Sequence, residues 1–434
     1  MRSLMVGLLA AALGAGAAWG EFVGHGGPVK GLAVSADGAE MVSTSFDYST
    51  IRWSLRDGSA LSVLYGHDAA VNAVAWLPGG KGFVTGSDDG SLAIWTAGAE
   101  KPSARLNGHA GRVSAVAVSP DGKLAASAAW DRTVRLWDLT TGKPLRTLEG
   151  HKDNVNAVAF TPDGATLASA GYDGALKLWR VADGTPLRDV VPGGAPINGL
   201  ALSPDGTRAA TAGADGKVRV WELGAEKPAL PLATLAPVPL LSVAWGADGR
   251  TIAAAGIDGA ATVWRLPDAA VLYRLGGDRG PIWSLAFTPD SRTLLAGGND
   301  RMIRQWSLET GRELDAPTPV RTVAADVQPG GDPVGERLWK RCSACHTLTP
   351  DGGHRAGPTL YGVMGRKIGT APGYPYSDAL KNGSIVWDEA TISDLFDRGP
   401  DKVTPGTKMP VQTIPNAQER AALVAYIRRA TSAP

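Results

Sequence analysis

The sequence predicts an all-β seven-bladed propeller followed by a small all-α domain. The first observation is a series of seven tryptophans spaced 42 or 43 residues apart, each with an aspartate six residues before it. The second is a CxxCH motif beyond the last of these tryptophans, which contains both cysteines of the chain. The third is an apolar N-terminal segment ahead of the repeats. Together these features divide the chain into a leader, a repeat array and a C-terminal domain.

Residues 1–20, MRSLMVGLLAAALGAGAAWG, have the features of a secretory signal peptide: an early arginine, an apolar run and small residues that suit signal peptidase. The apolar run is shorter than the roughly 20 residues of a spanning helix, although a retained anchor is the alternative. We therefore expect a periplasmic protein with no membrane span after signal cleavage. A formal net charge of +1 does not favour nucleic acid as a partner.

The repeats are expected to occupy residues 21–318. Each contains short runs of alternating apolar residues separated by a turn, which is Pro-Asp-Gly in units three to five. The tryptophans are Trp53, Trp95, Trp137, Trp179, Trp221, Trp264 and Trp306, and the aspartates are Asp47, Asp89, Asp131, Asp173, Asp215, Asp258 and Asp300. Gly-His pairs precede the tryptophan by 28 residues in the first four units, at His25, His67, His109 and His151. A serine or threonine stands four residues before the aspartate in the first five units, at Ser43, Thr85, Ser127, Ser169 and Thr211.

These marks resemble the WD40 repeat family, which implies a hydrogen-bonded His–Ser/Thr–Asp–Trp tetrad within each blade. Units five to seven depart from the pattern, with Gly193 and Asp278 at histidine positions and Ala254 and Ala296 at Ser/Thr positions. We expect these three blades to be the less stable part of a closed ring. Two segments compete for the outer strand of the seventh blade: TGRELDAP after the last repeat tryptophan, and AWGEFV before the first Gly-His pair.

A linker rich in Pro, Gly and Ala is expected at residues 319–331, followed by a separate domain at 332–434. Its segment RCSACHTL places Cys342 and Cys345 two residues apart, with His346 directly behind them. A closed zinc site would need more ligands than one cysteine pair provides, and a thioredoxin-like dithiol would need a βαβ setting. Histidine adjacent to the second cysteine favours covalent haem attachment, with two thioether tethers and one axial ligand.

Three further segments, GPTLYGVMGRKIG, APGYPYSDALKNGSIVW and PGTKMP, make residues 332–432 resemble class I cytochrome c of the mitochondrial and c2 type. The resemblance implies one covalent haem c, with His346 and Met409 as iron ligands. Met364 is the rival methionine. It also implies that the Pro358 carbonyl receives the second N–H of the ligand histidine. The residues that match positions near the haem propionates are Arg366, Tyr374, Tyr376 and Trp387. In the family a tyrosine usually stands in the pair occupied here by Leu395-Phe396.

The expected function is that of an exported cytochrome, which carries single electrons between redox partner proteins and uses the propeller as a docking scaffold. A reductase or dehydrogenase with the haem as an internal relay is the alternative, and an assembly scaffold is a third interpretation. No catalytic residue is expected in the propeller, which lacks cysteine and whose four histidines occupy tetrad positions. The candidate partner-binding residues are Phe46, Trp130, Tyr172 and Trp283, unless the linker or the C-terminal domain covers them.

Overall fold

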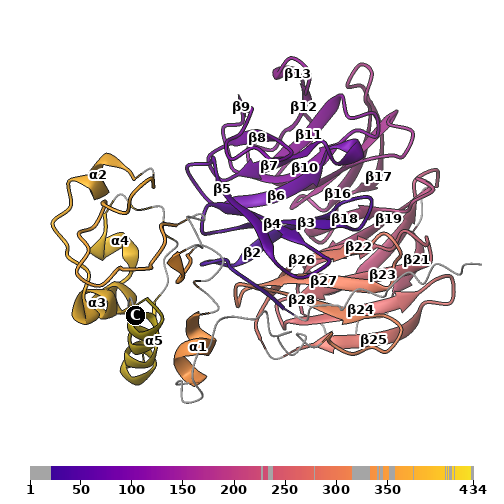
Figure 1. The fold of residues 1–434 in the computed structure, drawn as a ribbon. Helices are drawn as coiled ribbons and strands as arrows, with labels where there is room; N and C mark the ends of the chain where they lie inside the picture. The colour runs from indigo at the N-terminus through magenta and orange to yellow at the C-terminus, as the bar shows by residue number, and fades with distance from the viewer. Residues whose placement is uncertain are drawn as a thin grey trace, which may run out of the picture.

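The computed structural model describes residues 21–431 except 226–227, 233–237, 278, 315–332, 340–341, 343–345, 351–356, 375, 406, 408, 410–412 and 415. The expected signal peptide and linker, Cys345 and Asp278 therefore lie outside the described residues. The described part contains seven four-stranded antiparallel sheets and a small helical domain (Figure 1), the fold class that the sequence predicts. None of the described helices is long and apolar enough to span a membrane.

Each blade is a meander of short strands in which consecutive strands pair. The second strand of each blade is almost continuously buried because sheets of neighbouring blades cover both of its faces, whereas the outer strands are more exposed. In blades 1 to 3 the strands are β2 (Val29–Val34), β3 (Glu40–Ser45), β4 (Ser49–Ser54), β5 (Ala60–Tyr65), β6 (Val71–Trp76), β7 (Gly82–Ser87), β8 (Ser91–Thr96), β9 (Ala104–Asn107), β10 (Val113–Val118), β11 (Leu124–Ala129), β12 (Val134–Asp138) and β13 (Lys143–Leu148).

Blades 4 to 6 repeat this order, and blade 7 borrows its outer strand from the start of the chain. Their strands are β14 (Val155–Phe160), β15 (Thr166–Gly171), β16 (Ala175–Arg180), β17 (Pro186–Pro192), β18 (Ile197–Leu202), β19 (Arg208–Gly213), β20 (Val218–Glu222), β21 (Pro228–Leu232), β22 (Leu240–Trp245), β23 (Thr251–Gly256), β24 (Ala260–Arg265), β25 (Ala270–Gly276), β26 (Ile282–Phe287), β27 (Thr293–Gly298), β28 (Met302–Ser307) and β1 (Glu21–Val23).

The tetrads form in the first four blades. In blade 1, His25 Nε2 lies 2.7 Å from Ser43 Oγ, and Trp53 Nε1 donates to the same oxygen at 2.7 Å. His25 Nδ1 lies 3.2 Å from Asp47 Oδ2. His67, His109 and His151 make the corresponding contacts in blades 2 to 4. These bonds satisfy polar groups that would otherwise destabilise the sheets between which they are buried.

Arginine pairs with the tetrad aspartate in each of the three divergent blades. Arg219 Nη2 donates to Asp215 Oδ2 at 2.6 Å in blade 5, and Arg274 Nη2 donates to Asp258 Oδ2 at 2.8 Å in blade 6. In blade 7 the buried Arg304 forms an ion pair with Asp300. These blades lack the tetrad histidine, as the sequence indicates, but their aspartates keep a polar partner, because a cation from the third or fourth strand pairs with each of them.

The ring closes through both segments that the sequence left as alternatives. Strand β1 pairs with the first half of β28, from Glu21 opposite Arg304 to Val23 opposite Met302. Residues 312–314 follow the second half, where Glu313 bridges to Trp306 and the Leu314 N–H donates to the Gln305 carbonyl at 2.9 Å. Two short segments from the two ends of the repeat array thus share one edge.

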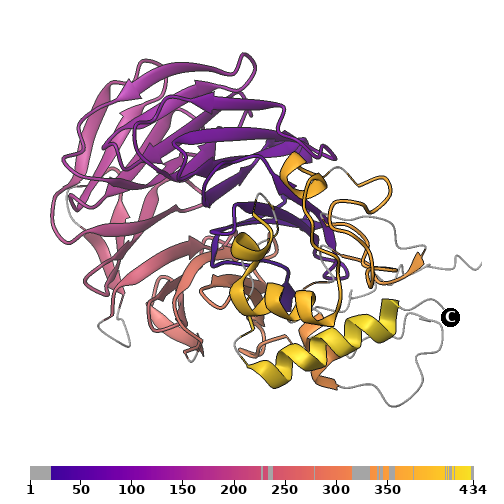
Figure 2. The same ribbon diagram turned by 90° about the vertical axis from the view of Figure 1, so that its left-hand side faces the viewer.

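The helical domain consists of α1 (Pro333–Trp339), α2 (Asp378–Lys381), α3 (Glu389–Arg398), α4 (Pro400–Val403) and α5 (Ala417–Thr431). Helices α1 and α5 pack closely, since a Cβ at Gly335 would lie 2.4 Å from the Ala422 carbonyl oxygen. Helix α3 begins at a capping box formed by Asp388 and Thr391. Figures 1 and 2 show this domain beside blade 1 and strand β28, and its core surrounds the site described next.

Candidate haem site

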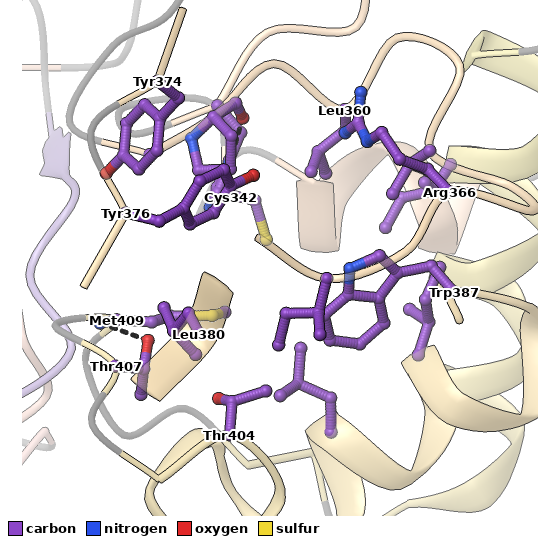
Figure 3. A pocket seen from close by; sticks show the side chains of 18 of the residues that line it. Cys342, Leu360, Arg366, Tyr374, Tyr376, Leu380, Trp387, Thr404, Thr407 and Met409 are labelled. Carbon is purple, nitrogen blue, oxygen red and sulfur yellow. Dashed lines mark hydrogen bonds between the residues drawn. The ribbon is translucent and has the colours of Figure 1, made fainter. Parts of the chain in front are cut away.

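A cavity of about 410 Å³ lies in the helical domain, and the propeller contributes one residue to its wall. Its volume is in the range of cofactor sites, and most of its wall is apolar. Figure 3 shows several of the side chains that surround it. The lining residues are Tyr65, Cys342, His346, Gly357, Pro358, Leu360, Val363, Arg366, Ile368, Tyr374, Tyr376, Ser377, Leu380, Trp387, Ile392, Leu395, Phe396, Thr404, Thr407, Met409 and Ile427.

His346 is held in a single orientation. Its Nδ1 lies 2.7 Å from the Pro358 carbonyl oxygen and donates to it, which leaves Nε2 without a proton and able to bind a metal. Enclosure of the ring lowers the pKa of His346, so the imidazole is neutral at neutral pH. Gly357 leaves the space for this ring, because a Cβ there would lie 2.3 Å from His346 Cε1.

Cys342 lies three residues after the last residue of α1 and points into the cavity (Figure 3). Its N–H donates to the Trp339 carbonyl at 2.8 Å, and its own carbonyl accepts from the His346 N–H at 2.9 Å. The end of α1 therefore places the first cysteine and the histidine beside one another on the cavity wall. Cys345, the second predicted attachment residue, lies outside the described residues.

Met409 reaches the same cavity from the loop after α4. Its backbone N–H is held by Thr407 Oγ1 at 3.0 Å (Figure 3). Met364, the rival methionine, packs against the hydrophobic core of the domain and is not among the residues that line the described cavity. The geometry therefore favours Met409 as the methionine that shares a site with His346.

The other predicted haem neighbours line the cavity as well. Arg366 donates to the Tyr361 carbonyl at 3.0 Å and to the Thr359 carbonyl at 2.6 Å, and Trp387 pairs with it through the backbone at 3.0 Å. The rings of Tyr374 and Tyr376 contact edge to face, with centroids 4.8 Å apart. Burial raises the pKa of Tyr376, which keeps its hydroxyl protonated as a hydrogen-bond donor.

Several lining residues were not predicted. Ile368 lies within the segment GPTLYGVMGRKIG, and Thr404 directly precedes PGTKMP. The sequence singles out neither of them as a residue of the site. Phe396 belongs to the Leu395-Phe396 pair, where the family usually has a tyrosine, and its buried ring forms part of the wall. Tyr65 belongs to strand β5 of the propeller, and no sequence pattern connects it with the C-terminal domain.

Comparisons with known proteins agree with this arrangement. The model of the family Cytochrome c matches residues 334–431. A cytochrome c of Sesamum indicum is 45% identical over 105 residues, which are 24% of this chain and 94% of the relative. The chain belongs to the cytochrome c family. A cytochrome c2 of Rhodoblastus acidophilus is 43% identical over 98 residues, which are 22% of this chain and 91% of that protein.

The propeller of this cytochrome matches a second family model. The WD domain, G-beta repeat, matches residues 58–96, 100–138, 142–180, 185–222 and 270–307. The chain thus combines WD40 repeats with a class I cytochrome c domain, as the resemblance predicts. The cytochrome c relatives cover only the second of these two parts.

A cytochrome c domain implies a haem c cofactor, and the described residues fit one. An imidazole nitrogen and a thioether sulfur, the axial donors that c-type haem uses, line one largely apolar cavity with a cysteine. The imidazole nitrogen that would not bind the iron, Nδ1, already donates its proton to the Pro358 carbonyl. Among the described residues no group of three or more His, Cys, Asp and Glu side chains gathers in a form that suits a metal ion.

Proposed function

We propose that the protein is an exported electron carrier in which one covalent haem c exchanges single electrons with partner proteins. The observation that carries this proposal is the convergence of His346, Cys342 and Met409 on one apolar cavity. Haem iron held by histidine and methionine supplies reversible ferric–ferrous chemistry. The protein positions the ligands, excludes water and fixes the histidine tautomer through Pro358.

The covalent attachment is the direct test. Thioether bonds keep the haem on the denatured chain, so haem staining of a denaturing gel should mark the wild type. The double variant Cys342→Ala, Cys345→Ala should lose the stain. Stain that persists in the double variant would contradict covalent haem at these positions.

Haem and metal content per chain also distinguishes the two classes of function. A carrier with a single site should contain one iron per chain and no second metal. A reductase or dehydrogenase that uses this haem as a relay would need a further redox centre, so a second cofactor in stoichiometric amount would favour the alternative.

Export is the second part of the proposal, supported by the N-terminal sequence. A charged start, an apolar run and small residues before Glu21 are typical of a signal peptide. The mature chain should therefore begin near Glu21 and be found in the periplasm. Intact-mass measurement of the purified protein, together with cell fractionation, checks both statements, and a retained leader would indicate an anchored protein.

The third part of the proposal is that partners dock on the propeller face that carries the aromatic residues. Phe46 and Tyr172 are large aromatic residues in turns, and they are 37% and 36% exposed. Trp130 is half-buried, with its ring 5.7 Å from that of Tyr172. None of these three residues lines the haem cavity. None of them lines the small space between residues 300–302 of the propeller and the cytochrome c domain either.

Two cations lie over these rings. Lys30 Nζ is 3.5 Å from the centroid of Trp283 and 5.1 Å from that of Phe46. The guanidinium of Arg112 is 3.1 Å from the centroid of Trp130. Burial and the charge of Arg112 lower the pKa of Lys30 to about 8, so both groups are still mostly charged at pH 7. Cations held against aromatic rings suit a partner that presents carboxylates.

A further inference from the structure

The propeller and the cytochrome c domain share the wall of the haem cavity. All lining residues but one belong to the cytochrome c domain, and the exception is Tyr65, the last residue of β5 in blade 1. Tyr65 comes from the propeller and lies at the boundary of the cavity, where water would otherwise be. The environment of the cofactor therefore depends on how the two domains are seated.

The backbone of Tyr65 is fixed by its strand pairing and by the packing of the two residues that follow it. Its backbone pairs with Ser49 at the end of the β4–β5 ladder. The next residue, Gly66, packs so tightly that a Cβ there would lie 2.7 Å from the ring of Trp95. His67 then enters the tetrad of blade 2, 2.8 Å from Thr85 Oγ1. A ring attached to so constrained a backbone has a defined position, unlike one on a flexible loop.

A second contact fixes the cytochrome c domain on the same part of the propeller. A small space of about 30 Å³ lies between the two domains. Its propeller side is formed by Val23, His25 and residues 300–302, and its cytochrome c side includes Cys342 and Phe396. Cys342 and Phe396 line the haem cavity too, so this contact of blades 1 and 7 reaches the same wall.

We propose that Tyr65 is a positioning residue of the haem site, which closes the cavity from the propeller and thereby raises the reduction potential of the iron. The inference rests on the proposed function. Ferric haem carries one more positive charge than ferrous haem, so water near the iron stabilises the ferric state more strongly. An aromatic ring that excludes water lowers the local dielectric constant and favours the ferrous state. The first blade is in this way part of the redox centre.

The test compares reduction potentials in the full-length haem protein. In Tyr65→Ala, water enters where the ring was, and the ferrous-to-ferric ratio at a fixed applied potential should fall about threefold or more. Tyr65→Phe keeps the ring and should stay close to the wild type. Tyr48→Ala removes a half-exposed tyrosine of the same blade that does not line the cavity, and it serves as the matched control. Tyr65→Thr, whose β-branched side chain suits a strand, replaces the alanine variant if that variant does not fold.

A second variant tests whether the seating of the cytochrome c domain affects the reduction potential, through its contact with residues 300–302. Met302→Glu places a charge in the small space between the domains and should unseat the cytochrome c domain. The potential should then fall in the same direction as in Tyr65→Ala. The methionine–iron charge-transfer absorption of the ferric protein should persist in all variants, which shows that ligation is unchanged.

The outcomes separate this inference from the proposed function. Absence of haem from the wild type would overturn the proposed function itself. Haem bound normally, with the same potential in Tyr65→Ala as in the wild type, would overturn only the role of Tyr65. A fall in Tyr65→Phe as large as that in Tyr65→Ala would assign the effect to the hydroxyl and would also overturn coverage by the ring.

Discussion

At the scale of single residues, the haem site depends on one glycine. Gly357 leaves room for the His346 ring, which a Cβ would approach to 2.3 Å. In Gly357→Ala the ring must move, and the 2.7 Å bond to the Pro358 carbonyl must lengthen. Loss of such a supporting bond typically weakens metal ligation about 10- to 100-fold.

We therefore expect Gly357→Ala to contain covalent haem with a substantial loss of the six-coordinate, low-spin form, which absorption spectroscopy measures. Gly224→Ala is the matched control, because a Cβ there has nothing within 4 Å. A low-spin spectrum identical to that of the wild type would show that the ring has more freedom than the structure indicates.

The two methionines allow a second test at this scale. Met409→His replaces a thioether by an imidazole, which stabilises ferric iron, so the potential should fall by on the order of 100 mV or more. Met364→Leu should leave the potential nearly unchanged, since Met364 does not line the described cavity. Redox titration of both variants decides the assignment. A large fall in Met364→Leu and none in Met409→His would reverse it.

At the scale of structural elements, the blades use two kinds of partner for the same aspartate. Histidine fills this role in blades 1 to 4, with Arg105 as a second partner of Asp89 in blade 2, and arginine fills it in blades 5 to 7. The two groups differ in titration, because arginine remains charged at all ordinary pH values whereas histidine does not. Burial lowers the pKa of both His109 and His151.

This difference predicts which blades respond to mild acid. A histidine with a lowered pKa binds fewer protons when folded than when unfolded, so the stability that it contributes is complete above the unfolded value near 6.5 and declines below it. The aspartates, whose pKa values are also lowered in blades 3 and 4, lose their contribution only below about pH 4. Between pH 7 and 5 only the histidine effect operates.

Hydrogen exchange, corrected for the intrinsic pH dependence of the rates, should therefore rise about threefold or more in blades 3 and 4 between pH 7 and 5. Blades 5 to 7 serve as the internal control and should change little. The sequence alone led us to expect blades 5 to 7 to open first at neutral pH, and the same data test that expectation. An equal acid response in all blades would contradict separate roles for histidine and arginine.

The repeat pattern predicts the blades and the histidine tetrads because both depend on short, regularly spaced local signals. The arginine pairs were not predicted, since residue identity alone does not reveal them. Arg135 stands two residues before its tryptophan, as Arg219 and Arg304 do, yet blade 3 keeps an intact histidine tetrad. Arg274 comes from the fourth strand instead, and Arg105 of the fourth strand in blade 2 pairs with Asp89 although His67 is present.

The residues of the candidate site also fall into two groups: those that the sequence predicts and those that it does not. His346, Cys342 and Met409 stand in motifs whose spacing reflects the chemistry of haem attachment, so the sequence singles them out. Tyr65 and the small space beside Val23 depend on how two domains pack, which short-range patterns do not encode. The shared outer strand of blade 7 was undecided for a related reason: both candidate segments pair with the same edge of β28, so neither sequence excludes the other.

At the scale of the whole molecule, the cytochrome c domain contacts the propeller on the face that carries the aromatic residues. Residues 300–302, which contact the cytochrome c domain, form the turn between the second and third strands of blade 7. Phe46, Trp130 and Tyr172 lie in the corresponding turns of blades 1, 3 and 4. A partner that covers the aromatic residues would therefore lie next to the cytochrome c domain, as electron transfer requires.

The double variant Trp130→Ala, Tyr172→Ala tests this docking face. Aromatic residues at the centre of an interface commonly contribute 1–2 kcal/mol or more each, so loss of both should weaken association with the redox partner by about 10- to 100-fold. Since Arg112 lies over Trp130, added salt should also weaken binding of the wild type more than that of the variant. The haem spectrum and the potential should not change, because neither residue lines the cavity.

The matched control is Leu145→Ala, which removes an apolar residue of β13 that is 50% exposed on the outer edge of blade 3. The measurement is the second-order rate of haem reduction by the partner, together with the dissociation constant of the complex. Equal losses in the control and in the double variant would mean that the surface acts without specificity. Partner binding and reduction at wild-type rates in the double variant would place the docking site elsewhere, and the edge of the cytochrome c domain away from blade 1 would then be the next surface to test.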